Sequence, residues 1–140
     1  MWRGWDSSRP EQPLSSDSTL PPLRLAVVGH VEWLEFLAVD QLPRPGAIGH
    51  ALRTLQEPAG GGAVVAVQMA RLQQQPVQFF TALGRDSVGE ACVKRLEHLG
   101  LEVHVAWREA PTRRGLSLVD GEGDRAITVM GERLTPSLDD

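Results

Sequence analysis

Short apolar runs alternate with amphipathic stretches along most of the chain. Three mainly apolar runs predict buried strands of a parallel sheet, at residues 23–29, 77–83 and 101–107. Residues 63–73 and 88–99 place apolar side chains at helical spacing. The first of these helices is apolar around most of its surface, so we expect it to pack on both sides. Strand, helix, strand, helix, strand in this order predicts an α/β sheet with right-handed crossovers.

Two pairs of extended segments interrupt or follow this alternation. Residues 36–42 and 47–56 flank Pro43-Arg44-Pro45-Gly46, a turn sequence in which proline fixes φ and glycine accepts an unusual conformation. They predict a small hairpin that projects from the sheet. A second hairpin is predicted within residues 112–130, with its turn at 120–124.

Three consecutive glycines, Gly60, Gly61 and Gly62, connect an extended segment to the first predicted helix. Glycine allows the backbone to approach a ligand closely, and the first amides of a helix have no intrahelical acceptor. The run therefore predicts either a ligand-binding loop or only a tight turn between strand and helix.

Three polar residues, His30, Glu32 and Glu35, follow the first predicted strand. Ligands of α/β sheets bind beyond the carboxyl ends of the strands, which makes these residues candidates for ligand contact. Each is equally compatible with a solvated loop residue.

Composition narrows the function classes. A chain of 140 residues can form one domain with a core, and a net charge of −4 gives no reason to expect nucleic acid or an anionic membrane as partner. No apolar run is long enough to span a bilayer. The single cysteine, Cys92, excludes an internal disulfide and favours the cytoplasm, while His50, His98 and His104 lack metal-ligand spacing. Residues 1–22 predict a disordered arm rather than a signal peptide.

Several local motifs occur in register. Residues 59–66 contain the glycine run followed by small residues, residues 40–46 follow the pattern Asp-x-Leu-Pro-x-Pro-Gly, and residues 84–89 follow Gly-x-Asp-x-x-Gly. Together they resemble the N-terminal half of the PfkB/ribokinase family of carbohydrate kinases over about residues 24–134. Val64 departs from the family signature, which usually has Asn there.

The resemblance implies a ribokinase-like α/β fold. Residues 23–140 would form the N-terminal part of a three-layer αβα sandwich, with lid strands near 36–56 and 112–130. In such kinases the lid strands often form the dimer contact, so a homodimer through them is one expected partner. A small-molecule sugar or nucleoside is the other.

The resemblance also implies which residues would bind the substrate. Gly60, Gly61 and Gly62 would form the floor of the sugar site. The family uses an Asn and an Asp after the first strand to hold sugar hydroxyls, and alignment on the preceding glycine places Glu32 and Leu34 there. Glu32 can accept hydrogen bonds from hydroxyls and Leu34 cannot, so a ribose-like substrate does not follow.

The catalytic motif of the family, Gly-x-Gly-Asp at the start of a helix, belongs to the C-terminal half. Gly121-Glu122-Gly123-Asp124 has the same letters but lies between two strand patterns, so it predicts a hairpin turn. We therefore expect no catalytic residue and no metal-binding or cofactor-binding residue in this chain. ATP and Mg²⁺ are implied only for full-length members.

Three hypotheses follow. The chain is the N-terminal, substrate-binding portion of an ATP-dependent sugar or nucleoside kinase, which transfers the γ-phosphate to a substrate hydroxyl and is truncated by a premature stop, a gene split or an incomplete gene model. Alternatively, it is a non-catalytic sugar- or nucleoside-binding module, or half of a split kinase. In the third hypothesis it is an unrelated α/β domain. Under the first two, the chain alone is expected to be inactive as a kinase.

Overall fold

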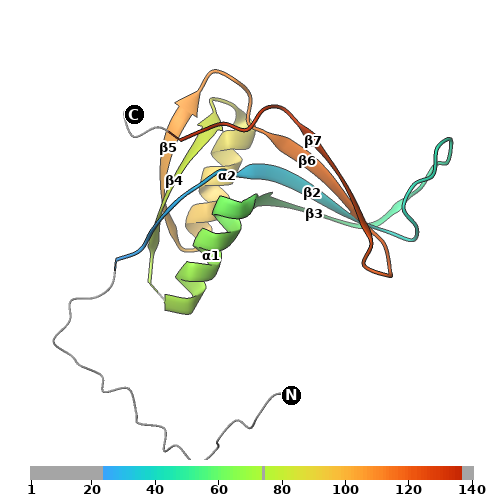
Figure 1. Ribbon diagram of the computed structural model, residues 1–140, viewed down its shortest axis with the longest axis horizontal. Helices are drawn as coiled ribbons and strands as arrows, with labels where there is room; N and C mark the ends of the chain where they lie inside the picture. Colours follow the sequence, from blue (N-terminus) through green and yellow to red (C-terminus); the bar gives the residue numbers. More distant parts are fainter. Residues whose placement is uncertain (1–23, 74, 137–140) are drawn as a thin grey trace, which may run out of the picture.

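The computed structural model describes residues 24–73 and 75–136 (Figure 1). The predicted arm at residues 1–22 lies outside this described part. Three parallel strands form one sheet in the order β1-β4-β5, with β1 at Ala26–Val28, β4 at Val77–Gly84 and β5 at Leu101–Arg108. This confirms the prediction of a parallel sheet from three apolar runs.

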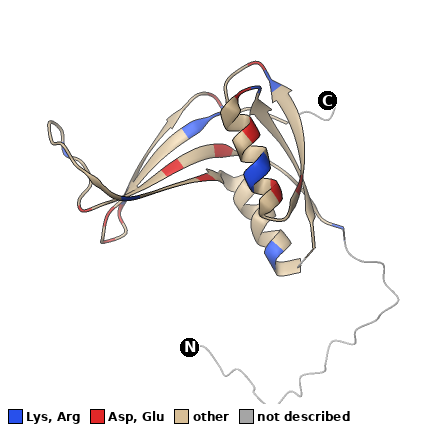
Figure 2. Ribbon diagram, turned by 180° about the vertical axis from the view of Figure 1, so that it is seen from behind, with Lys and Arg blue, Asp and Glu red and all other residues tan. Residues whose placement is uncertain are grey.

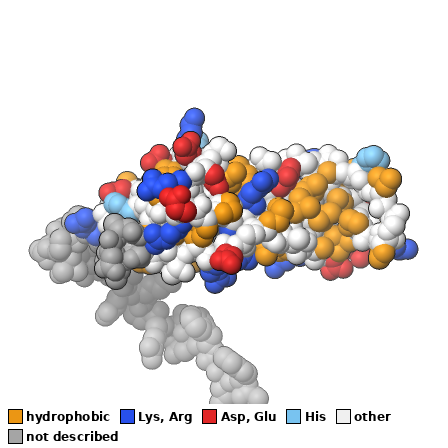
Figure 3. Space-filling model, turned by 90° about the horizontal axis from the view of Figure 1, so that it is seen from above, with side chains coloured by type: hydrophobic (Ala, Val, Ile, Leu, Met, Phe, Trp, Pro, Cys, Tyr) orange, Lys and Arg blue, Asp and Glu red, His pale blue; other side chains and the backbone are white. Residues whose placement is uncertain are grey.

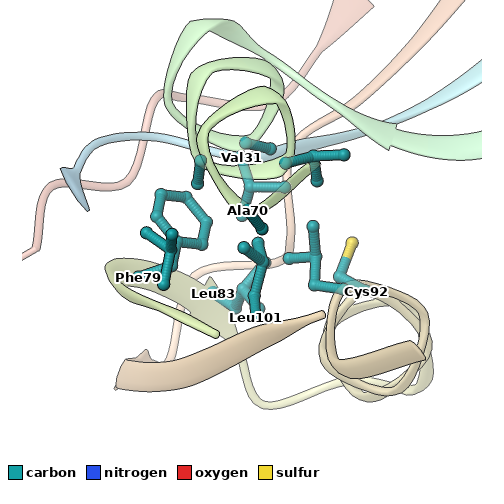
Figure 4. Packing of buried hydrophobic residues seen from close by; sticks show 11 residues of the cluster. Val31, Ala70, Phe79, Leu83, Cys92 and Leu101 are labelled. Carbon is teal, nitrogen blue, oxygen red and sulfur yellow. The ribbon is translucent and has the colours of Figure 1, made fainter. Parts of the chain in front are cut away.

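Two helices cover this sheet, α1 at Gly61–Gln73 and α2 at Ser87–His98. Their buried faces meet β4 and β5 in one core, which Figure 4 shows from close by. Fully buried members of the core include Phe79, Leu83, Cys92 and Leu96. The expectation that α1 packs on both sides is wrong for the described chain, because its outer face leaves four residues exposed: Val64, Val65, Met69 and Leu72.

A second sheet extends away from the helices (Figure 1). Its order is β3-β2-β6-β7, with β2 at Glu32–Val39, β3 at Ala51–Ala59, β6 at Arg114–Val119 and β7 at Arg125–Met130. β2 pairs with β6 in parallel, and the two outer pairs are antiparallel.

Basic and acidic residues are interspersed along α2 and the second sheet. The view in Figure 2 shows no region of a single charge sign.

The structure corrects one boundary and confirms one turn. Residues 32–35, which the sequence placed between the first strand and the extended segment 36–42, belong to β2. The predicted turn between β6 and β7 is present, because Oδ1 of Asp120 accepts hydrogen bonds from the amides of Glu122 and Asp124, both at 3.0 Å. Gly123 has φ +89°. The Gly-Glu-Gly-Asp sequence is therefore a hairpin turn and not a helix start.

Of the two helices in the described ranges, neither is sufficiently long and apolar to cross a membrane.

Candidate functional site

The glycine run lies against the end of β1. A Cβ on Gly29 would lie 2.7 Å from Cα of Gly62, and a Cβ on Gly62 would lie 2.8 Å from the carbonyl oxygen of His30. Two backbones at this distance leave no room for a side chain at either glycine. The sequence predicted that another group could approach the glycine run closely. At Gly62 that group is the protein's own backbone, at Gly29 and His30.

His30 lies over the start of the same run. A Cβ on Gly60, which has φ +92°, would lie 3.0 Å from Nε2 of His30, whereas the nearest atom to a Cβ on Gly61 would be Cε1 of His30 at 3.8 Å. Burial, followed by the positive charge of Arg133, lowers the pKa of His30 below its ordinary value, although Glu32 acts in the opposite direction. The imidazole is therefore neutral at neutral pH.

Glu32 opens β2 beside the glycine run. It is the Cα partner of Ala59 across the antiparallel pair, so its backbone lies one residue from Gly60. Its Oε2 lies 2.7 Å from Nε of Arg113, and the two side chains are 14% and 20% exposed. Neither atom has a hydrogen-bond partner in the described chain, so the contact is an ion pair without hydrogen-bond geometry.

The structure brings together only part of the predicted set. His30, Glu32 and the three glycines lie around the first turn of α1. Glu35 is an odd number of residues from Glu32 along β2 and lies on the opposite face of the second sheet. Leu34 is buried, and a Cβ on Gly115 would lie 2.3 Å from its Cδ2, so this side chain fills the space above Gly115.

Sequence reasoning missed two arginines of this site, Arg113 and Arg133. Arg113 reaches Glu32 because β2 and β6 pair in parallel, and Trp33 donates a backbone hydrogen bond of 2.9 Å to the carbonyl of Arg113. Arg133 follows β7 and acts electrostatically on His30. The only local signal was that Arg113 falls within the predicted hairpin of residues 112–130, and a predicted hairpin does not indicate which other strand pairs with it.

Hydrogen bonds of Asp86 and Thr112 hold the segment that carries Arg113 in place. Asp86 caps α2 by accepting from the amide of Gly89 at 2.7 Å, and it also accepts from the amide and hydroxyl of Thr112, both at 2.8 Å. Thr112 Oγ1 accepts in turn from the amide of Gly84 at 3.0 Å. These bonds attach the connection that carries Arg113 to the end of β4.

The described residues contain no group of three His, Cys, Asp or Glu side chains that could hold a metal ion. The site around Gly60 has instead one carboxylate, one neutral imidazole and two guanidinium groups. Such a set can accept and donate hydrogen bonds to hydroxyl groups.

Comparison with known proteins decides the family. The pfkB family of carbohydrate kinases matches residues 23–135, and these residues make up most of the chain. The chain belongs to the pfkB family of carbohydrate kinases. This overturns the hypothesis of an unrelated α/β domain. No curated protein matches the chain.

Solved structures agree with the pfkB assignment. Ribokinase from Thermotoga maritima is 29% identical with a TM-score of 0.66, over 77% of this chain and 36% of that chain. Phosphofructokinase-2 from Escherichia coli in complex with fructose-6-phosphate is 21% identical with a TM-score of 0.68, over 79% and 36%. Ribokinase from Arabidopsis thaliana complexed with ribose and ATP is 24% identical with a TM-score of 0.61, over 77% and 36%.

This pfkB-family chain therefore spans only about 36% of the length of these solved relatives. The fold class is that of a ribokinase-like α/β protein, of which the chain represents a part.

Proposed function

We propose that this chain is the substrate-binding portion of an ATP-dependent sugar or nucleoside kinase, with Glu32, Gly60, Gly61 and Gly62 in contact with the substrate. The observation that carries the proposal is the pairing of Glu32 with Ala59, which sets a carboxylate beside the glycine run at the start of α1. A polyol needs acceptors and donors close together, and a carboxylate beside backbone amides supplies both.

The second sheet serves as a lid in this proposal. It carries Glu32 at the first residue of β2 and extends from there beyond the helices (Figure 1). A lid over a bound sugar keeps water away from the transferred phosphoryl group.

ATP and Mg²⁺ belong, in this proposal, to the part of the kinase that this chain does not span. The described residues do not fit a nucleotide–metal site, because Gly29 and His30 lie against the first turn of α1 and no cluster of metal ligands is present among them. When bound, ATP supplies the phosphoryl group, and the described residues hold and orient the acceptor hydroxyl.

Ligand-dependent thermal stability of the whole 140-residue chain tests the binding proposal. We expect at least one of ribose, fructose and adenosine to raise the midpoint of thermal unfolding, because a ligand that binds only the folded state stabilises it. Glu32→Gln should weaken that binding by about tenfold or more, and Glu35→Gln, on the other face of β2, should not. No shift with any of the three, or equal binding by Glu32→Gln, would refute the assignment of Glu32.

The alternatives to a truncated kinase are a non-catalytic binding module and half of a split kinase. Incubating the chain with ATP, Mg²⁺ and each sugar should give no ADP. Turnover that disappears in Asp124→Asn would contradict this expectation and restore a catalytic role to the hairpin turn. Sugar binding without turnover fits all three forms. A Gly-x-Gly-Asp continuation in the DNA downstream of the coding sequence would favour the truncated kinase, and its absence would favour the other two.

A homodimer through the lid strands is also part of the proposal. Leu55 and Ile127 are exposed and share a face of the second sheet with the partly buried Phe36, because all three belong to one row across the strands. Figure 3 shows hydrophobic side chains gathered over this end of the molecule. Sedimentation velocity should show a dimer that Leu55→Lys dissociates, whereas Leu72→Lys on α1 should leave it intact. A monomeric native chain would rule out this contact.

We propose the cytoplasm as the location, on the basis of ATP dependence and of a free, fully buried Cys92.

A further inference from the structure

Three charged groups of the described chain act on His30, the residue that lies over the glycine run. They are the side chains of Arg133, Glu32 and Arg113. Because the imidazole of His30 is itself neutral, these groups together carry one net positive charge. The complete chain carries a net charge of −4, so the excess at this site is opposite in sign to that of the protein. An excess of this kind favours an anionic ligand.

The charge of Arg113 is already matched by a carboxylate. Its Nε lies 2.7 Å from Oε2 of Glu32, and both side chains are largely buried. Arg133 differs, because it is exposed and no carboxylate of the described ranges lies within ion-pair distance of it. Glu132, its neighbour in the sequence, is also exposed and is not one of the groups that act on His30. The unmatched positive charge of the site is therefore that of Arg133.

The register of the second sheet brings Arg133 to this site. Trp33 of β2 pairs with Arg114 of β6, which pairs with Met130 of β7. The next row toward the glycine run contains Ala59, Glu32, Arg113 and Gly131. A Cβ on Gly131 would lie 3.7 Å from Cα of Arg113, and Gly131 has φ +86°, a conformation that lets the chain bend after β7. Arg133 follows two residues later, at the end of the sheet that carries Glu32.

The first turn of α1 adds to the positive potential. The amide of Val64 donates to the carbonyl of Gly60 at 3.0 Å, so the amides of Gly61 and Gly62 precede the first hydrogen bond of the helix and have no acceptor within it. This turn contains no acidic side chain that could neutralise the positive end of the helix dipole. The helix end therefore reinforces the positive charge of Arg133.

We propose that the substrate of this site is an anionic polyol, a sugar or nucleoside that carries a phosphate monoester or a carboxylate, and that Arg133 binds its anionic group. Glu32 accepts hydrogen bonds from hydroxyl groups of the same molecule. An anion offers the guanidinium of Arg133 charge-assisted hydrogen bonds that a neutral sugar does not. This assignment rests on the proposed function, because it names the substrate class of the same site.

Isothermal titration of the whole 140-residue chain with matched pairs of ligands tests the proposal. Three pairs differ by a phosphate: ribose and ribose 5-phosphate, fructose and fructose 6-phosphate, and adenosine and adenosine monophosphate. Sorbitol and gluconate differ by a carboxylate. We expect the anionic member of at least one pair to bind about tenfold more tightly than the neutral member, and this preference to fall as sodium chloride is added. The pair that shows the preference identifies the anionic group.

Arg133→Gln should bring the two members of that pair to equal affinity. Because Arg133 is exposed, this variant should fold, and its circular dichroism spectrum should match the native one. Arg125→Gln is the matched control, since it removes the same charge from an exposed position at the other end of β7, and it should keep the preference.

Equal affinity of the two members in every pair would overturn the anionic substrate and leave the proposed function standing. A preference that survives in Arg133→Gln would overturn the role of Arg133. Inorganic phosphate that binds as tightly as the sugar phosphate would overturn the proposal too, because the site would then recognise an anion and not a polyol. If neither member of any pair binds, the proposed function fails, and the anionic substrate fails with it.

Discussion

Arg95 of α2 holds Glu57 of β3 through two hydrogen bonds, although 38 residues separate them along the chain. Nε donates to Oε2 at 2.7 Å, and the second guanidinium nitrogen donates to the other carboxylate oxygen. The hydrogen bond to Glu57 raises the pKa of Arg95 above its ordinary value. Glu57 lies three residues before Gly60, so this bidentate pair ties the base of the second sheet to the helix layer just ahead of the candidate site.

Replacement of Arg95 should loosen the base of the second sheet. In Arg95→Met we expect faster hydrogen exchange of the β3 amides near Glu57 and a fall of a few degrees in the unfolding midpoint, because the partly buried carboxylate loses its partner. Lys94→Met, at an exposed neighbouring position, is the control. Equal exchange rates in the two variants would mean that the pair does not hold the sheet.

The contact between Gly29 and Gly62 makes a second prediction possible. Gly62→Ala should lower the free energy of unfolding by about 1–3 kcal/mol or more, because the new methyl group would overlap the backbone of Gly29 and His30. Gly61→Ala should be neutral or slightly stabilising, since its Cβ would meet only the His30 ring at 3.8 Å. Urea unfolding of both variants measures the difference. Similar stabilities would show that the two backbones can separate without cost.

Local patterns predicted the helices and the parallel strands well, because apolar periodicity depends on nearby residues alone. β2 was placed too late in the sequence, since Glu32 and Glu35 interrupt the apolar pattern at its start. The pairing of β2 with β6 was not predictable either, because it joins segments about 80 residues apart. The ion pair between Glu32 and Arg113 depends on that pairing and was missed with it.

The outer face of α1 shows a different limit. Its apolar residues indicated packing on two sides, and the described chain covers one. An apolar helix face predicts that the face is suited to packing. The structure shows only the packing contacts that the described residues make with one another.

Asp86 should make stability depend on acid pH. Burial opposes its ionisation, but hydrogen bonds from Gly89 and Thr112 outweigh burial and lower the pKa of the carboxyl below its ordinary 3.8. The unfolded chain takes up the proton at the ordinary pKa, so the stabilisation is complete above that pH and is lost as the pH falls through the lower folded pKa.

Asp86→Ala should therefore cost about 1–2 kcal/mol at pH 7, the usual effect of losing a helix N-cap, and progressively less toward pH 3. Urea unfolding at both pH values measures this, with Asp40→Ala at an exposed position as control. A cost that stays constant with pH would show that the charge of Asp86 contributes nothing.

Cys92 should be inert in the folded chain and reactive in the unfolded one. It is fully buried, and burial, assisted by the negative charge of Asp86, raises the pKa of its thiol to about 12. Because the thiolate is the reactive form, a disulfide reagent at pH 8 should label Cys92 only as fast as the core opens, and urea should release one equivalent of reaction at once. Ser87→Cys, at the exposed start of α2, should add one immediate equivalent without urea. Rapid labelling of the native chain would mean that the core between α2 and the parallel sheet opens far more often than its packing indicates.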